Sequence, residues 1–191
     1  MARVLRFPIL VMSIAGLALA ATVIAAPGIA ATQGADVTPD AAVKAAFLYN
    51  FVKFTEWPEL PPGSPLVICS VGDDAIAAAL VETVRGQNVS GHAFEVRRPQ
   101  DSTTWRSCHL LFIADVEMKR SLGGLGALKA QPVLTVGDAR GFAQSSGIIE
   151  FYVESGHMRF AINVNAAERS GLRLSSRLLG LAKIVRDSHV S

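Results

Sequence analysis

Residues 66–71 read Leu-Val-Ile-Cys-Ser-Val, and the turn-forming Gly72-Asp73-Asp74 follows them directly. Two further apolar runs have the same form, since each is followed within two residues by an aspartate. Aliphatic runs of this length are typical of strands covered on both faces, and helices between them favour parallel crossovers. The runs are Leu66–Val71, Leu110–Ala114 and Val133–Val136, and the expected helices are an alanine-rich stretch to Val84 and a second from about Glu117 to Lys129.

A helix precedes the first run. Thr38-Pro39-Asp40 supplies an N-cap, a proline in the first turn and an acid near the positive end of the helix dipole. Helical spacing continues to about Thr55, and Pro58 stops it. The apolar positions expected on its buried face are Val43, Phe47, Phe51 and Phe54. Further along, His92–Val96 alternates as a strand does.

The carboxyl-terminal third is predicted to start with an antiparallel hairpin, Ile148–Val153 and His157–Val164 around Glu154-Ser155-Gly156. A short helix capped by Asn165 and Glu168 and ended by Gly171 should follow, then a second helix from Ser175. Its buried face would hold Leu178, Leu181, Ala182 and Val185. The sequence therefore predicts a single α/β domain with a largely parallel sheet, flanking helices and an added antiparallel hairpin.

The first 31 residues have the order of an export signal. Arg3 and Arg6 precede the uncharged run Ile9–Ala26, and small residues follow. We expect a signal peptide over residues 1–31 with cleavage at about 25–31, a tether over 32–37 and the α/β domain over 38–191. The alternative is an uncleaved membrane anchor. With cleavage the protein would be periplasmic in a Gram-negative bacterium.

Charge balance excludes one class of function. The chain has 18 basic and 16 acidic residues, and the signal peptide takes away Arg3 and Arg6 as its charged residues. The mature chain then has equal numbers of each. A nucleic-acid-binding protein usually needs a surplus of Lys and Arg, so no nucleic acid is expected as a partner.

The two cysteines, Cys69 and Cys108, lie outside any metal-binding spacing. In an oxidising compartment such a pair indicates a disulfide. Two buried free thiols, or a nucleophilic pair of Cys69 with His109, remain as alternatives.

Four aspartates follow the predicted strands and would lie at the carboxyl edge of the sheet, where open α/β folds bind ligands. They could hold a divalent cation, but helix capping explains them more simply. No nucleophile elbow, phosphate loop or histidine pair accompanies them, so neither a catalytic site, a metal nor a cofactor is expected. Gly123-Gly124-Leu125-Gly126 is interpreted as a helix end. The aspartates are Asp73, Asp74, Asp115 and Asp138.

Two segments could contact a partner. From Ser155 onward six basic residues stand against two acidic ones, which favours an acidic partner or simply a solvated surface. Between Phe47 and Trp57 the chain has five aromatic residues, more than one buried stripe needs, so part of this segment could be exposed.

Three stretches resemble the YfiR-like family. Residues 44–58 read KAAFLYNFVKFTEWP, residues 147–151 (GIIEF) lead into 159–163 (RFAIN), and residues 172–182 read LRLSSRLLGLA. The resemblance implies a non-catalytic periplasmic repressor. It would bind the periplasmic portion of a membrane-bound diguanylate cyclase, be released by an outer-membrane lipoprotein and form homodimers. It also implies a disulfide between Cys69 and Cys108, whereas residues 143–146 lack a second cysteine pair.

We therefore expect a regulator that represses a membrane-bound signalling enzyme, with Trp57, Phe151, Arg159 and Arg177 as candidate contacts. A periplasmic small-molecule sensor or carrier that uses the carboxyl edge of the sheet is the second hypothesis. A hydrolase or metal enzyme that depends on Asp73 or Asp115 is the third.

Overall fold

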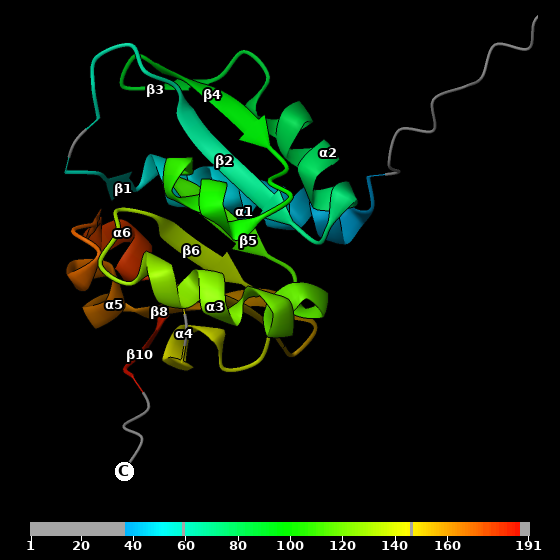
Figure 1. The fold of residues 1–191 in the computed structure, drawn as a ribbon. Helices are drawn as coiled ribbons and strands as arrows, with labels where there is room; N and C mark the ends of the chain where they lie inside the picture. The colour runs from blue at the N-terminus through cyan, green and yellow to red at the C-terminus, as the bar shows by residue number, and fades with distance from the viewer. Residues whose placement is uncertain (1–36, 59, 146, 188–191) are drawn as a thin grey trace, which may run out of the picture. The chain divides into compact units, whose positions relative to one another are not determined.

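The three apolar runs form neighbouring parallel strands at the centre of the main sheet (Figure 1). They are β2 (Leu66–Val71), β5 (Leu110–Ile113) and β6 (Leu134–Gly137), and all four residues of β5 and of β6 are buried. This confirms strands that are covered on both faces. Within the described residues the strand order is β10-β8-β7-β6-β5-β2-β4-β3.

The structure is a computed structural model that describes residues 37–58, 60–145 and 147–187. The predicted signal peptide, and the tether up to residue 36, lie outside these ranges. Among the described residues, no helix combines the length and apolarity that crossing a membrane requires.

Helices α1 (Pro39–Lys53) and α2 (Asp74–Val84) cover one face of the sheet. The Thr38 side chain accepts a hydrogen bond from the Ala41 N–H at 3.2 Å, which confirms the predicted cap. The buried stripe of α1 is rotated from the predicted one, because small alanines let this helix pack closely. Val43 is exposed, and the stripe is Ala41, Ala45, Leu48 and Val52, with Phe51 beside it.

The opposite face is covered by η1 (Ser102–Ser107), α3 (Met118–Leu128) and α4 (Phe142–Ser145), with the short η2 (Asp115–Glu117) leading into α3. Side chains from these helices form a second core with the outward-facing residues of β2 and β5. That core contains Val67, Cys69, Leu111, Ile113, Trp105, Cys108, Leu125, Leu128 and Phe142.

The helix expected from about Glu117 to Lys129 is confirmed as α3, but the glycine run does not end it. Gly123, Gly124 and Gly126 all lie inside α3, which continues to Leu128. Gly124 lies against the Trp105 ring: a Cβ there would come within 2.5 Å of Trp105 Cζ3. Packing of η1 on α3 therefore outweighs the low helix propensity of glycine.

The predicted hairpin is confirmed as β7 (Ile149–Glu154) and β8 (His157–Asn163). Ser155 and Gly156 form its turn with φ of 51° and 76°, the left-handed conformation that two-residue hairpin turns require. β7 is parallel to β6, and a smaller hairpin of β3 (Asn88–Val89) and β4 (His92–Arg97) extends the other end of the sheet.

The carboxyl-terminal elements differ from the prediction at two points. Asn163, rather than Asn165, caps α5 (Val164–Arg169), because its side chain reaches the Ala166 N–H at 3.0 Å. Ser175 does cap α6 (Ser176–Leu179), but this helix is one turn long. The chain then forms β10 (Lys183–Val185), since the edge of β8 offers backbone pairing to this β-branched run.

A small second sheet was not predicted. β1 (Thr55–Glu56) pairs antiparallel with β9 (Arg173–Leu174), and the Ser175 N–H donates to the Phe54 carbonyl at 2.9 Å. This sheet ties the end of α1 to the segment between α5 and α6, and Figure 1 shows β1, α5 and α6 at one end of the domain.

Candidate functional site

The carboxyl edge of the main sheet is occupied by contacts within the chain. Asp73 Oδ1 accepts from the Ile76 N–H at 2.9 Å, so this residue caps α2 as the simpler interpretation predicted. Asp138 Oδ1 accepts from the Asp115 N–H at 2.7 Å, and its Oδ2 accepts from Lys44 Nζ at 2.8 Å. Asp74 is exposed and lies 3.4 Å from Arg98.

Lys44 joins α1 to this edge. Its Nζ lies between Asp138 and Asp40, the latter at 3.1 Å. Burial alone would lower the pKa of Lys44, but the hydrogen bonds and charges of the two carboxylates outweigh it and raise the pKa. The pair of Lys44 and Asp138 is therefore a charged structural contact.

Glu117 lies over Gly72 at the crevice expected between the ends of β2 and β5. Helices α2 and α3 follow these strands on opposite faces, which makes the gap between the strand ends the usual ligand site of such a fold. Gly72, at φ 83°, lies directly under the Glu117 side chain. A Cβ at this position would collide with Glu117 Cγ and lie 3.4 Å from Ala114 Cβ. Among the described residues no group of three or more His, Cys, Asp or Glu side chains could hold a metal ion.

Cys69 and Cys108 form a disulfide, with their Cα atoms 5.9 Å apart. This confirms the expected disulfide and leaves Cys69 without a thiol to act as a nucleophile with His109. The bond joins β2 to the residue that ends η1 and is buried beside Trp105.

His109 follows the disulfide and supports the amino end of the sheet. Its ring Nδ1 accepts from the Val67 N–H at 3.0 Å, and the ring lies edge-on to Trp57 at 5.8 Å between centroids. Burial, and then the charges of His92 and Arg97, lower the pKa of His109. The ring is therefore neutral at pH 7.

Two of the four predicted contact residues lie at the same end of the domain. Trp57 follows β1, and Arg177 lies in α6, directly after β9. Because β1 and β9 are paired, the structure brings both residues to the small sheet. Trp57 is half-buried and Arg177 is exposed, so this end combines an aromatic surface with a cation.

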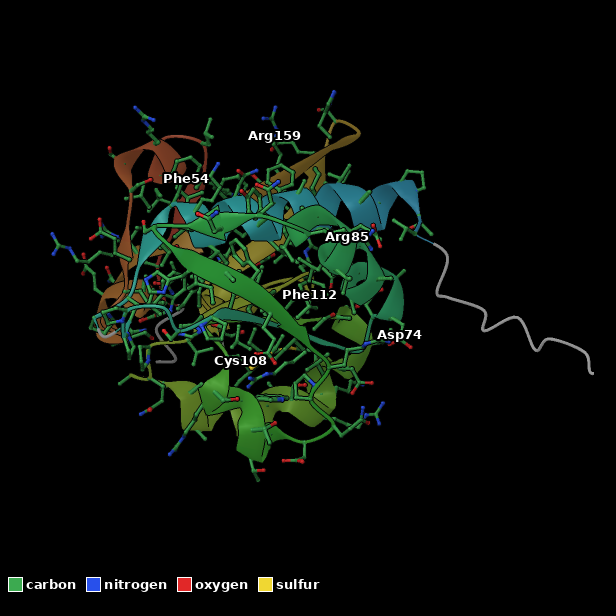
Figure 2. The ribbon with its side chains drawn as sticks, turned by 90° about the horizontal axis from the view of Figure 1, so that it is seen from above. Phe54, Asp74, Arg85, Cys108, Phe112 and Arg159 are labelled. Carbon is green, nitrogen blue, oxygen red and sulfur yellow. A yellow bond between two sulfur atoms is a disulfide. The ribbon has the colours of Figure 1, made fainter. Side chains whose placement is uncertain are left out.

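Arg159 lies elsewhere, on the β7–β8 hairpin, where it faces Tyr152 across the two strands. Figure 2 labels Arg159, and also Phe54 at the end of α1, on the same side of the domain in that view. Its side chain is exposed.

Phe151 is a core residue, and its selection as a contact is wrong. It is 2% exposed and packs on Phe47 at 5.9 Å and Phe51 at 5.5 Å between ring centroids. Most of the aromatic-rich segment between Phe47 and Trp57 serves this cluster instead of forming a broad exposed patch.

Tyr152 and Lys183 lie beside Arg159 on the sheet; Lys183 belongs to the basic set expected from Ser155 onward, whereas nothing in the sequence pointed to Tyr152. Lys183 Nζ is 5.9 Å from the Tyr152 ring centroid. The segment with Lys183 was predicted to be helical, and the adjacent β-branched pair Ile184-Val185 was the available signal for a strand.

The chain matches a known protein family. Residues 41–183 match the model of the family described as YfiR/HmsC-like. This range takes in nearly the whole described domain, from the first turn of α1 to the start of β10. No curated protein matches the chain.

Proposed function

Because the chain belongs to the YfiR/HmsC-like family, we propose that it is a non-catalytic periplasmic regulator that restrains a membrane-bound diguanylate cyclase. The match over residues 41–183 carries this proposal. It is supported by the carboxyl edge of the sheet, where Asp73, Asp138 and Glu117 are engaged in contacts within the chain.

Restraint requires preferential binding to the inactive conformation of the enzyme. A regulator that bound both conformations equally would shift nothing, however tightly it bound. We assign this contact to the small-sheet end, defined by Trp57, β1, β9 and Arg177. Tryptophan and arginine side chains are among the residue types that dominate binding energy at interfaces, and here Trp57 is half-buried and Arg177 exposed. The homodimer and the lipoprotein antagonist implied by the resemblance remain predictions.

Deleting the gene should raise cellular cyclic di-GMP, and the wild-type gene should restore the original level. Arg177→Glu should fail to restore it at equal protein level, because it reverses the charge at the contact. Lys119→Glu is the matched control, since Lys119 is an exposed cation on α3, far along the chain from the small sheet. Trp57→Ala should also fail to restore the cyclic di-GMP level, and a thermal melt of this variant checks that it is folded.

Unchanged cyclic di-GMP in the deletion strain, with the protein normally expressed, would contradict the proposal. The sensor or carrier alternative would then have a hollow of about 560 Å³ available, lined by Lys129, Val133 and Ile148 among others. This hollow lies at the amino ends of β6 and β7, not at the carboxyl edge where a ligand was expected.

A further inference from the structure

One end of the main sheet has an open edge. β10 is the last strand in the order, and it pairs in parallel with β8 along Lys183–Val185. No other described strand pairs with its outer side. The backbone groups on such an edge are a template for an additional strand.

One face of this edge is basic. Arg159 lies opposite Tyr152, and Lys183 lies opposite Ala161, two residues along β8 from Arg159. Side chains two residues apart in a strand share a face, so Arg159 and Lys183 lie on the same side of the sheet. Tyr152, Ala161 and Lys183 line a hollow of about 510 Å³ there, together with Arg140.

The cations of this face lack acidic partners. Neither Arg140, Arg159 nor Lys183 forms a salt bridge with any described carboxylate. The two acids that line the hollow are engaged: Asp138 with Lys44, and Glu150 with the N–H groups of Gly141 and Ala143 at 3.0 and 3.2 Å. Backbone N–H groups do not neutralise Glu150, so the cations Arg140, Arg159 and Lys183 stand against the carboxylates of Glu150 and of the exposed Glu154. The face therefore keeps a net positive charge.

The other face of the same edge is apolar. Ile184 is in register with the buried Ile162, so its side chain lies on the α1 side of the sheet. It is nevertheless 51% exposed, and Leu181, two residues before the strand, is 74% exposed.

We propose that the β10 edge binds an extended segment of an acidic partner protein, in which acidic residues alternate with apolar ones. Side chains of an added strand point alternately to the two faces, so its acids would meet Lys183 and Arg159 while its apolar residues cover Ile184. A second copy of this chain fits poorly, because two paired β10 edges would gather Lys183 and Arg186 from both copies. This surface is formed by residues other than those that define the small-sheet end, and the inference does not rest on the proposed function.

The test uses the full mature chain and a fluorescent eight-residue peptide of alternating glutamate and valine. Fluorescence anisotropy at low and at physiological salt should detect binding. Arg159→Ala and Lys183→Ala should each weaken it about two- to fivefold, the size expected for partly exposed charge pairs. Lys119→Ala, at an exposed cation on α3 outside β7, β8 and β10, is the matched control and should change nothing. N-methylation of alternate peptide backbone nitrogens should weaken binding about tenfold or more, because it removes the strand hydrogen bonds.

Four results would overturn the inference. If a lysine–valine peptide bound with equal affinity, charge would not contribute to binding. If the N-methylated peptide bound with unchanged affinity, the peptide would not bind as an added strand. Binding to phosphatidylglycerol vesicles without binding to the peptide would assign the basic face to a membrane. Absence of peptide binding together with a dimer that Ile184→Ala dissociates in sedimentation would assign the edge to a second copy.

Discussion

His109 connects three strands through one residue. Its ring accepts from the Val67 N–H, its own N–H donates to the Val67 carbonyl at 2.8 Å, and its carbonyl accepts from the Leu134 N–H at 2.8 Å. A proton on Nδ1 would replace the first of these hydrogen bonds with a clash of two donors. The ring is also the surface on which Trp57 rests.

The free energy of unfolding should therefore fall with acidification. The pKa of His109 in the folded protein lies below its ordinary value of 6.5, so the unfolded chain binds the proton more readily. Stability contributed by the neutral ring is present above pH 6.5 and is lost as the pH falls below that value. Urea unfolding at pH 7.5 and pH 5.5 measures the loss.

His109→Asn is the informative comparison, because an amide oxygen can still accept from the Val67 N–H but does not titrate. The variant should lose less stability between the two pH values than the wild type does. An equal loss in both proteins would contradict the assignment to His109 and point to another titrating group.

Gly124 and Gly123 are neighbours in α3 with opposite expected responses to alanine. A Cβ on Gly124 would lie 2.5 Å from Trp105 Cζ3 and 2.6 Å from Ser102 Cβ, whereas one on Gly123 would meet nothing within 4 Å. Gly124→Ala should destabilise the fold by about 1–3 kcal/mol through overpacking. Gly123→Ala should stabilise it by roughly 0.5–1 kcal/mol through helix propensity. Thermal or denaturant unfolding of the two variants measures both changes in the free energy of unfolding. If both variants were stabilised, or both destabilised, the prediction would be contradicted.

Among the elements, β2 and the η1–β5 connection depend on the disulfide. Cys69 and Cys108 are 39 residues apart, and closing a loop of that length restricts the unfolded chain by about 4 kcal/mol on the entropic model. The double variant Cys69→Ala, Cys108→Ala should lower the free energy of unfolding by about 2–5 kcal/mol. Dithiothreitol should lower wild-type stability to a similar level and leave the double variant unchanged. Equal stability of the oxidised and reduced wild type would contradict this.

The elements that the sequence predicted best are those with a strong local signal. β2, β5 and β6 are continuous apolar runs, and the hairpin turn has a glycine where φ must be positive. β10 was missed because Leu178, Leu181, Ala182 and Val185 also fit helical spacing, and only the free edge of β8 decides between the two conformations. β1 and β9 are two residues each, which is too short for any periodicity.

For the whole molecule, the sequence suggests residue types that could contact a partner but not how they are arranged. Trp57 and Arg177 are 120 positions apart in the numbering. The pairing of β1 with β9 brings both residues to the small sheet, and no sequence pattern predicts this pairing. Phe151 was wrongly expected to contact a partner, because the sequence alone does not distinguish an aromatic strand residue in the core from one on a binding surface. The cluster of Phe47, Phe51 and Phe160 decides it, and these side chains come from segments distant in sequence.

The Cys69–Cys108 bond also changes how the molecule would respond to a protease. All of α2, β3, β4 and η1 lie between the two cysteines, including the turn of Ser90 and Gly91 with positive φ. A single cut in that turn would leave two polypeptides that remain covalently attached. They would migrate together in non-reducing electrophoresis and separate when a reductant is added, so a nicked molecule keeps both fragments in one particle.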